Sequence, residues 1–377
     1  MRSQVIVWGL LLVILASPLS AAVINVPAES STIQAALDGA TNGDSIIVAA
    51  GSYSENLSFL GKAVVLRSSA GAAATTITPA TTTIPIVRFE GGEDTLSILD
   101  GFTLSGTTTA SGIRINGASP VVRNCVITSC VSSGSGAGIS IVSGAGRILD
   151  NDIFGNQAGG FGGGIHCSQA GTQTCVIRGN SIHDNNSTNQ GCGISLSQVE
   201  NYIVSHNLIY ANSSSGTDIA GIWLRGNDIQ ATNNTIVDNP AGLTVTAATN
   251  LTIRNNLVAF NAGVGIEPVG DYNLVWSNGT DGDPGPNGLN ADPLLADYMN
   301  GDLQLLPGST CIDAGDPDPA YNDSDLTRND IGALPATTYP IAVPITFGAP
   351  AVGNVVFSAT PEVNWDYFDT LVSSQAQ

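Results

Sequence analysis

Short apolar segments with a period of two recur along this chain, and the same polar residues separate them. The clearest unit is an asparagine, one residue, an aliphatic residue, two residues and a second asparagine. Complete copies begin at Asn151, Asn180, Asn207, Asn234 and Asn256. A weaker copy begins at Asn124, with Ser129 in its last place, and Gly101 takes the first place one repeat earlier. This regular recurrence predicts a repeat architecture.

Two further apolar elements complete each repeat. One is a glycine followed by an aliphatic residue, and its copies begin at Gly112, Gly138, Gly164, Gly193, Gly221, Gly242 and Gly265. The other is an apolar pair just before the first asparagine, such as Cys175 and Ile177, with Leu96 and Ile98 before Gly101. Pieces this short and this rich in glycine and asparagine do not form helices. The pattern therefore predicts an all-β fold, a parallel β-helix with three strands in each coil.

Stacking of at least seven such coils would turn each repeat position into a column of similar residues. Because inward residues of one coil are covered only by the next coil, we expect one buried aliphatic column. Its members are Ile113, Ile139, Ile165, Ile194, Ile222, Leu243 and Ile266. The repeated asparagines should form amide ladders, as in other stacked strands, so we expect them to be structural rather than catalytic.

The two ends of the repeat region carry different signals. The segment from Ser31 to Gln34 predicts a capping box, followed by a short amphipathic helix that closes the N-terminal end. The apolar residues of this helix are Ile33, Ala36, Leu37 and Ala40. The repeats fade after about Asp271, where the sequence becomes rich in Asp, Pro and Gly.

The N-terminal composition predicts where the protein is located, and the net charge excludes one class of partner. The net charge is −20 and only one lysine accompanies ten arginines, so nucleic acid is excluded as a partner. Arg2, the apolar run 5–16 and the small residues Ser20 and Ala22 predict an export signal, with an uncleaved anchor as the alternative. We therefore expect a secreted or cell-surface protein without a membrane span after cleavage. The expected division is signal peptide 1–22, β-helix 23–335 with its cap and Asp-rich segment, and C-terminal cover or tail 336–377.

Four segments resemble a known family. They are Asp44 to Tyr53, Gly61 to Leu66, Leu303 to Asp318 and Asn322 to Gly332. Together with the repeats, they resemble the right-handed parallel β-helix proteins of the pectin-lyase-like superfamily over roughly residues 23–335. The resemblance implies a single-stranded right-handed parallel β-helix. That superfamily includes lyases, hydrolases, epimerases and adhesins, so it leaves two functions open: a non-catalytic glycan-binding or structural module, and a polysaccharide lyase or glycoside hydrolase.

Catalytic candidates are few. Lys62, the only lysine, falls in a recurrent first-coil position, which favours a structural role. Asp150, Asp152, His183 and Asp184 lie on consecutive coils and would gather on one side as a carboxylate and histidine cluster. The alternative for these four residues is a solvated turn beside the asparagine ladder.

A glycan-binding strip is the stronger candidate. The residue after each glycine and aliphatic pair should point outward, which places Arg114, Ser140, His166, Ser195, Trp223, Thr244 and Glu267 in one column. Arg225 and Asn116 fall in a second outward column. Tryptophan stacks on sugar rings, and arginine bonds to their hydroxyls, so this surface suits a polysaccharide or a cell-surface glycan. Alternatively, the strip is simply exposed and Trp223 packs under a loop or under the C-terminal tail.

Acidic and sulfur-containing residues suggest two further features. The residues Asp313, Asp316, Asp318, Asp323, Asp325 and Asp330 predict a bound calcium ion, because Ca²⁺ takes several oxygen ligands. The alternative is an acidic loop bonded to backbone N–H groups or to Arg328. Cys167 and Cys175 occupy inward positions on either side of one turn. They would form a disulfide across this corner or simply fill the core as small apolar residues.

Overall fold

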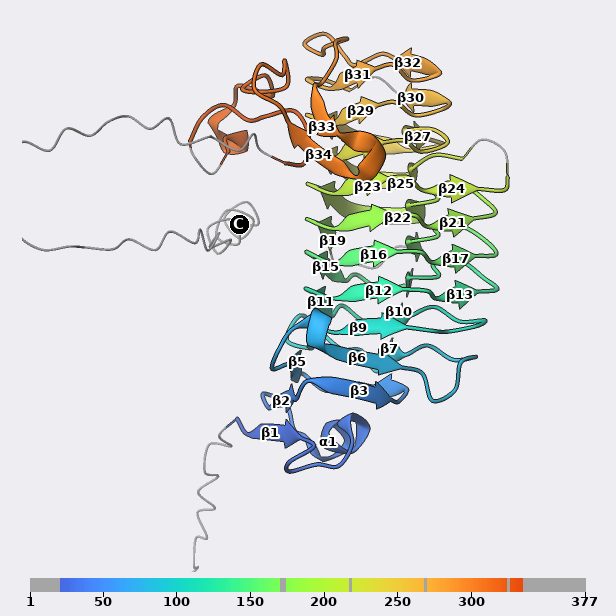
Figure 1. Cartoon of the computed structure of the whole chain (residues 1–377), viewed down its shortest axis with the longest axis vertical. Coiled ribbons are helices and arrows are strands. Elements are labelled where there is room, and N and C mark those ends of the chain that lie inside the picture. The colour runs from blue at the N-terminus through green and yellow to red at the C-terminus, as the bar shows by residue number, and fades with distance from the viewer. Residues whose placement is uncertain (1–20, 170–173, 217–218, 268–269, 324–325, 335–377) are drawn as a thin grey trace, which may run out of the picture. The chain divides into compact units, whose positions relative to one another are not determined.

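The predicted β-helix is confirmed by a computed structural model, which describes residues 21–169, 174–216, 219–267, 270–323 and 326–334. The chain forms an all-β, right-handed parallel solenoid of about 9 turns with one short helix near its N-terminus (Figure 1). The first 20 residues of the expected signal peptide and the expected C-terminal cover or tail, 336–377, lie outside the described residues. Among the described residues, no helix has the length and apolar character needed to cross a membrane.

Three walls enclose the core. The first wall contains β4 (Leu57–Ser58), β7 (Val87–Phe89), β10 (Ile113–Asn116), β14 (Ile139–Val142), β18 (Ile165–Ser168), the first half of β22 (Ile194–Ser205), the first half of β25 (Ile222–Thr232), β27 (Leu243–Val245), β30 (Val264–Ile266) and β32 (Thr280–Gly282). From β10 to β27, these strands directly follow the repeated glycines. The second wall contains β1 (Val23–Val26), β2 (Ser45–Val48), β5 (Val65–Ser68), β8 (Ile98–Asp100), β11 (Val121–Arg123), β15 (Arg147–Leu149), β19 (Cys175–Arg178), the second halves of β22 and β25, and β28 (Thr249–Arg254).

The third wall is a separate sheet of ten strands. They are β3 (Gly51–Ser54), β6 (Thr75–Thr78), β9 (Thr103–Ser105), β12 (Val126–Thr128), β16 (Asp152–Phe154), β20 (Ser181–His183), β23 (Leu208–Tyr210), β26 (Thr235–Val237), β29 (Leu257–Ala259) and β31 (Leu274–Trp276). In the repeat units, these strands are the segments between the two asparagines.

The expectation of three strands per coil needs two amendments. Four coils carry an additional short strand between the third and first walls: β13 (Val131–Ser132), β17 (Gln157–Ala158), β21 (Asn186–Ser187) and β24 (Ser213–Ser214). In two coils the first-wall and second-wall strands are continuous, as β22 and β25, because the backbone bends through the corner without leaving the strand conformation.

The expected inward column is confirmed. Its members Ile113, Ile139, Ile165, Ile194, Ile222, Leu243 and Ile266 pair residue by residue from coil to coil. Each is at most 2% exposed. The core is therefore continuous along the solenoid and depends on every coil being covered by its neighbours.

The asparagine ladders are also confirmed, and there are two of them. In each, the side-chain amide and the backbone N–H of one asparagine both donate to the Oδ1 atom of the asparagine in the next coil, at 2.9–3.2 Å. The first ladder runs through Asn151, Asn180, Asn207, Asn234, Asn256 and Asn273. The second runs through Asn156, Asn185, Asn212, Asn239, Asn261 and Asn278.

The predicted register is wrong by one residue at the beginning of the ladders. Cys125 and Cys130, rather than Asn124 and Ser129, take the ladder places, and their N–H groups donate to Asn151 and Asn156. Asn124 and Gly101 instead occupy the preceding position, where φ is +52° and +78°. Glycine and asparagine are the residues that best tolerate this left-handed conformation. An asparagine at this position can therefore be mistaken for a ladder residue when only the sequence is considered.

At the other end, the repeat continues for one coil beyond Asp271. Asn273 and Asn278 extend both ladders, in a coil whose first asparagine follows the previous one by only 17 residues. The short spacing obscures this copy in the sequence, because the other complete copies lie 22 to 29 residues apart.

The N-terminal end is closed as expected. Helix α1 (Ile33–Gly39) buries its apolar residues, but Thr32 rather than Ser31 is the N-cap, and its hydroxyl accepts from the N–H of Ala35. Lys62 has the structural role expected of it: its ammonium group donates to the carbonyls of Leu37 and Asp38 at the C-terminal end of the helix, which carries partial negative charge.

The C-terminal segment packs on the outer surface of the third wall. It contains the antiparallel hairpin β33 (Leu295–Asp297) and β34 (Asp302–Leu305), with short 3-10 turns at Tyr298–Asn300 and Pro319–Tyr321 (a further one, Ala72–Ala74, precedes β6). Its buried residues form a second apolar cluster with the outward side chains of β26, β29 and β31. The third wall contributes Val237, Leu257, Ala259 and Leu274 to this cluster, and the C-terminal segment contributes Leu295, Leu303, Leu305, Cys311 and Ile331.

Candidate functional site

The first-wall strip predicted from the sequence exists as a column of outward residues. Arg114, Ser140, His166, Ser195, Trp223 and Thr244 pair with one another on successive strands. Glu267 continues the column beyond β27, where its N–H donates to the carbonyl of Leu243, and its side chain is exposed. Arg114 is also exposed and forms an ion pair with Glu90 at 3.1 Å.

The expectation that Trp223 and His166 are exposed is wrong. Each is only 7% exposed, because the glycine-rich loop 159–164 places Phe161 between them. The centroid of the Phe161 ring lies 5.7 Å from that of His166 and 5.8 Å from that of Trp223, in stacked orientations. The indole N–H donates to Thr246 at 3.2 Å. Trp223 thus packs under a loop, which was the alternative interpretation, and offers no free ring face to a sugar.

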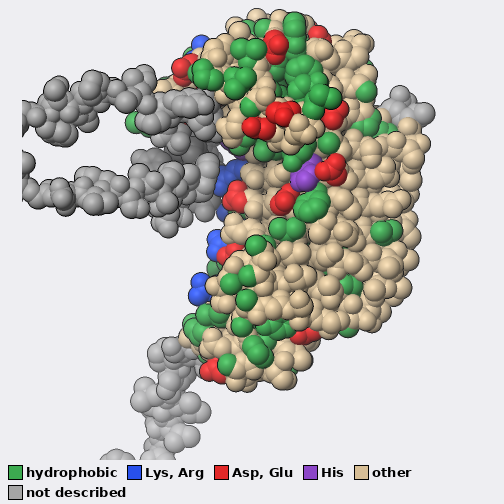
Figure 2. Space-filling view, in the orientation of Figure 1, with side chains coloured by type: hydrophobic (Ala, Val, Ile, Leu, Met, Phe, Trp, Pro, Cys, Tyr) green, Lys and Arg blue, Asp and Glu red, His purple; other side chains and the backbone are tan. Residues whose placement is uncertain are grey.

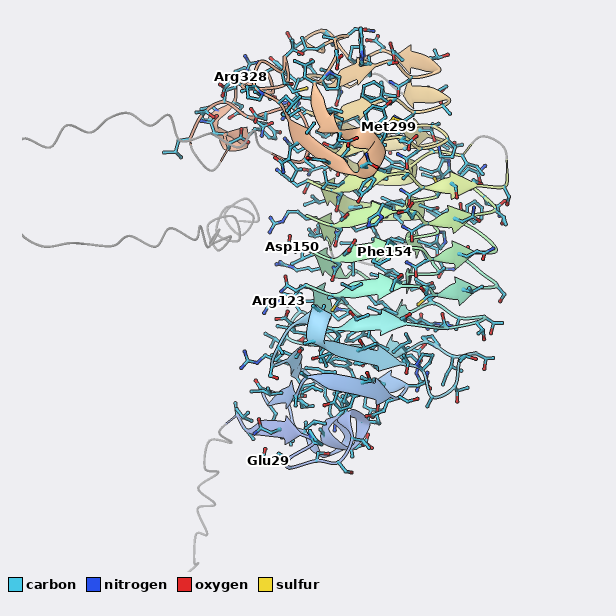
Figure 3. All side chains as sticks on the ribbon, viewed as in Figure 1. Glu29, Arg123, Asp150, Phe154, Met299 and Arg328 are labelled. Carbon is cyan, nitrogen blue, oxygen red and sulfur yellow. The ribbon has the colours of Figure 1, made fainter. Side chains whose placement is uncertain are left out.

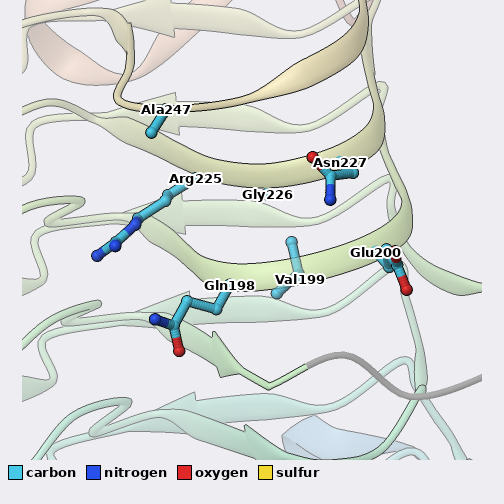
Figure 4. A pocket seen from close by; sticks show the side chains of 7 residues that line it. All are labelled: Gln198, Val199, Glu200, Arg225, Gly226, Asn227 and Ala247. Carbon is cyan, nitrogen blue, oxygen red and sulfur yellow. The ribbon is translucent and has the colours of Figure 1, made fainter.

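Where the strip meets the second wall, an open depression of about 410 Å³ lies over the two continuous strands (Figure 4). A β-bulge in β22, with Gln198 as the additional residue between Ser197 and Val199, lies where the strand bends at this corner. Gly226 makes the bend possible, since a Cβ atom there would lie 2.2 Å from the carbonyl oxygen of Val199. The depression is lined by Gln198, Val199, Glu200, Arg225, Gly226, Asn227 and Ala247.

The lining of this depression provides amide, carboxylate and guanidinium groups from adjacent coils. Gln198, Glu200, Arg225 and Asn227 are all exposed. The Oδ1 atom of Asn227 accepts from the Thr249 hydroxyl, which leaves its NH₂ group, together with the other three side chains, to hydrogen-bond with the hydroxyls of a sugar. Only Arg225 was predicted from the sequence. Gln198 and Glu200 lie at the bulge, and Asn227 pairs with Glu200 on the next strand. The repeat pattern contains no signal for a bulge, because a bulge is one additional residue in a corner of variable length.

Three of the four catalytic candidates come together on the third wall. The imidazole of His183 bonds to Asp152 through Nε2 at 3.0 Å and to Asp184 through Nδ1 at 2.8 Å. The ring is also stacked between Phe154 and Tyr210, with centroids 5.0 Å and 4.7 Å away. Since both ring nitrogens are already bonded to carboxylates, this arrangement ties two coils together and leaves neither nitrogen free for proton transfer.

Asp150 does not join this cluster, contrary to the expectation. Asp150 directly follows β15 of the second wall, at the left edge of Figure 3, whereas Asp152 comes after the ladder residue Asn151 and is the first residue of β16 on the third wall. Burial raises the pKa of Asp150, and the positive charges of Arg178 and Arg123 act in the opposite direction. The ladder turn is the physical reason for the separation, because it changes the direction of the chain between the two residues.

Two histidines are expected to give opposite pH dependences of stability. Burial lowers the pKa of His183, but the bonds to Asp152 and Asp184 outweigh it and leave this pKa above 6.5. Its contribution is therefore fully present below about pH 6.5 and is lost as the pH rises through the folded-state pKa. Burial lowers the pKa of His166 to about 4, so the fold loses stability as the pH falls from 6.5 towards that value.

Unfolding by denaturant at about pH 5 and about pH 8 would test this expectation. His183→Gln should cost more stability at the lower pH. His166→Gln should remove a pH-dependent loss of about 1–3 kcal/mol and so be less harmful at the lower pH. Parallel pH profiles for the two variants and the wild type would contradict both assignments.

Four of the six aspartates proposed to bind calcium, Asp316, Asp318, Asp323 and Asp330, accept hydrogen bonds from protein groups. Asp316 pairs with Arg254, and Asp330 and Asp323 accept from the backbone N–H groups of Asp313 and Asp330. Arg328 donates to the carbonyls of Gly315 and Ala314. Among the described residues, no three His, Cys, Asp or Glu side chains converge as metal ligands, and Asp325 lies outside those residues. Calcium binding stays a prediction.

The six cysteines are buried thiols. Cys167 and Cys175 lie close together in the core at this corner, as expected, so that each thiol affects the pKa of the other. The Cys175 thiol also donates to the carbonyl of Gly146 at 3.1 Å. The structure has no disulfide between them and agrees with the alternative, in which both fill the core as small apolar residues.

Comparison with known proteins supports the fold. The sequence family described as the right handed beta helix region matches residues 108–280. A pectate lyase, Pel9A, is similar in structure with a TM-score of 0.50 and 13% identity, over 84% of this chain and 96% of the lyase.

Two epimerases are similar at lower scores. The A-module of the mannuronan C-5 epimerase AlgE6 from Azotobacter vinelandii has a TM-score of 0.37 and 16% identity, over 69% of this chain and 93% of that chain. The periplasmic alginate epimerase AlgG has a TM-score of 0.36 and 13% identity, over 71% of this chain and 82% of that chain. A comparison with curated sequences gave no match. The chain is thus a right-handed parallel β-helix protein with the fold of the pectate lyase-like proteins.

Proposed function

We propose that this protein is exported and binds a glycan in the corner depression between the first and second walls. The observation that supports this is the lining of the depression. Four exposed polar side chains from two adjacent coils, Gln198, Glu200, Arg225 and Asn227, surround an open space of about 410 Å³. Pel9A, whose fold is similar, is by its name a lyase of pectate, which is a carbohydrate. This similarity of fold supports a carbohydrate ligand for the present chain.

Binding without hydrolysis fits the depression better than glycoside hydrolysis does. A glycosidase of the usual type needs two carboxyl groups on either side of the scissile bond. Among the described residues that line the depression, Glu200 is the only carboxylate. The cluster of His183, Asp152 and Asp184 lies on a different wall, and both nitrogens of its imidazole are bonded. A lyase in which Arg225 is the base is the alternative function, and the same experiment tests it.

The experiment measures the affinity of the wild type for a panel of plant, algal and bacterial polysaccharides, and the release of reducing or unsaturated ends from each. Arg225→Ala and Asn227→Ala should each weaken binding of the preferred polysaccharide, the arginine change by about tenfold or more, because it removes hydrogen bonds from a charged donor. Gln230→Ala changes an exposed amide on the same strand outside the depression and should leave the affinity within about twofold.

If some polysaccharide binds and all three variants bind it as the wild type does, with unchanged thermal stability, the depression is not the site. Release of products that is lost in Arg225→Ala would replace the binding function by the lyase alternative.

A further inference from the structure

The corner depression has a positive side and a negative side. In Figure 4 the side chains of Arg225 and Gln198 extend to the left, whereas those of Glu200 and Asn227 lie at the right. Val199, which is buried, lies between the two sides and gives the depression an apolar floor. The depression therefore holds one guanidinium group and one carboxylate apart, with an apolar surface between them.

Neither of these two charges is neutralised within the described residues. Arg225 and Glu200 are both exposed, and neither side chain forms a hydrogen bond or an ion pair there. Asp228, directly after Asn227 in the sequence, is exposed as well and adds a second carboxylate beyond the Glu200 side of the depression. Arg225 is the only Arg or Lys on strands β18, β22, β25 and β27, all of which the structure describes. The two sides of the depression thus have opposite charge.

Arg225 differs in this respect from other arginines of this acidic protein. The net charge is −20, and on the face shown in Figure 2 Asp and Glu side chains are spread widely, whereas Lys and Arg side chains lie at the left margin. Arg114, Arg123 and Arg254 each form an ion pair with a carboxylate. Arg225 has no such partner among the described residues. Its guanidinium group is therefore available to a carboxylate of a bound molecule, with which it would form strong, paired hydrogen bonds.

We infer that the ligand of the depression carries both charges and is a glycan in which an acidic sugar is joined to an amino sugar with a free ammonium group. This inference rests on the proposed function and names the class of glycan. The carboxylate of the acidic sugar pairs with Arg225, and the ammonium group of the amino sugar pairs with Glu200. The apolar C–H faces of the sugars lie over Val199.

The spacing of the two charges suits neighbouring sugars. Arg225 and Asn227 are two residues apart on β25, so their Cα atoms are separated by roughly 6.6 Å. Glu200 is paired with Asn227 on the adjacent coil, and its side chain and that of Arg225 extend away from each other (Figure 4). The glycan therefore lies along β25 and crosses the direction of the solenoid axis.

Two opposite charges also select against glycans with one kind of charge. A glycan with carboxylates alone brings one of them close to Glu200, and a glycan with ammonium groups alone brings one close to Arg225. In both cases like charges repel, and one charged group of the protein is left without a partner. A glycan with both charges pairs with both groups, so we expect it to bind most tightly.

Short hyaluronan oligomers, in which glucuronate alternates with N-acetylglucosamine, supply a matched set of probes. Removal of the acetyl groups gives the oligomer with both charges. The parent oligomer has carboxylates alone, and reduction of carboxylates to alcohols gives the ammonium-only and neutral forms. The full chain should bind the oligomer with both charges about tenfold more tightly than each of the other three. This preference should weaken as salt is raised, because ions screen exposed charges.

Two variants assign the charges to the two sides. Arg225→Gln and Glu200→Gln should each weaken binding of the oligomer with both charges by about tenfold. Arg225→Gln should not weaken binding of the ammonium-only oligomer, and Glu200→Gln should not weaken binding of the carboxylate-only oligomer. Arg67→Gln and Glu267→Gln are the matched controls, because each changes an exposed charged residue outside the depression. Both should keep all four affinities within about twofold.

Equal binding of the charged and neutral oligomers by the wild type would overturn the inference, as would equal losses for all four oligomers in both variants. A linear peptide with one Lys and one Glu that binds as tightly as the oligomer with both charges would also overturn it. If some polysaccharide of the panel loses affinity in Arg225→Ala but the oligomer with both charges is not preferred, only the class of glycan is wrong. If no glycan loses affinity in that variant, the proposed function fails as well.

Discussion

Replacing Asn207 by alanine is expected to lower the free energy of unfolding by about 3–5 kcal/mol. Asn207 is completely buried in the middle of the first ladder. Its Nδ2 donates to the carbonyl of Ile177 and to Asn234, and its Oδ1 accepts both the N–H and the side-chain amide of Asn180. Alanine removes all four bonds and leaves buried donors and acceptors of two coils without partners, each at a cost of about 1–3 kcal/mol.

Asn186→Ala is the matched control. Asn186 lies on β21 in an adjacent coil, but its side-chain amide forms an exposed hydrogen bond to Ser213, at 3.0 Å, rather than a buried one. We expect this change to cost less than about 1 kcal/mol. Unfolding in denaturant, followed by circular dichroism, gives both values. If both variants lost a similar amount of unfolding free energy, the hydrogen bonds of the ladder would be little stronger than those that the same amides form with water in the unfolded chain.

Replacing Gly193 by alanine is expected to destabilise the solenoid by about 2–4 kcal/mol through overpacking. The backbone of Gly193 is compatible with any residue, so the cost is steric rather than conformational. A Cβ atom would lie 2.8 Å from a methyl carbon of Ile209 and 2.9 Å from the carbonyl oxygen of Gly221 in the next coil. Neither neighbour can withdraw easily, because one is in the core and the other is backbone of the first wall. This contact explains why glycine recurs before the first-wall strands of the repeat.

Gly134→Ala serves as the comparison for this change. A Cβ at Gly134 would meet only the Ser132 hydroxyl, at 3.8 Å, and the position needs no left-handed conformation. We expect a change of no more than about 0.5 kcal/mol. Thermal and denaturant unfolding of both variants would test the argument, and a Gly193 variant as stable as the Gly134 variant would show that adjacent coils can move apart to accept a methyl group.

The fold could be predicted because it repeats. A residue such as Ile194 has an equivalent at the same place in successive coils, so stacking and inward direction follow from the pattern. The burial of Trp223 could not be predicted in this way. Its position in the outward column was correct, but its burial depends on Phe161, which lies in a loop that belongs to no repeat. The depression could not be predicted for the same reason, since the bulge at Val199 is a local departure from the pattern.

One sequence signal does indicate the covered part of the third wall. Most strands of this wall alternate between a buried aliphatic residue and more polar outward residues, as in β20 with Ser181 and His183. In β29 all three residues, Leu257, Val258 and Ala259, are apolar and buried. Consecutive apolar residues in a short strand indicate that both of its faces are covered. The Asp-rich composition of the C-terminal segment suggests a metal, but the leucines of this segment are the residues that pack against the wall.

The ladders also separate what is fixed in this molecule from what can vary. The two asparagines of a unit are always five residues apart, yet successive coils differ in length from 29 to 17 residues. All of this difference falls outside the segment between the two asparagines, in the strands of the first and second walls and in the connections around them. During evolution, insertions and deletions in those connections can therefore change the outer surface of single coils. The spacing between the stacked asparagines stays the same. An ancestral solenoid could acquire new surfaces through such length changes alone, without any repacking of its interior.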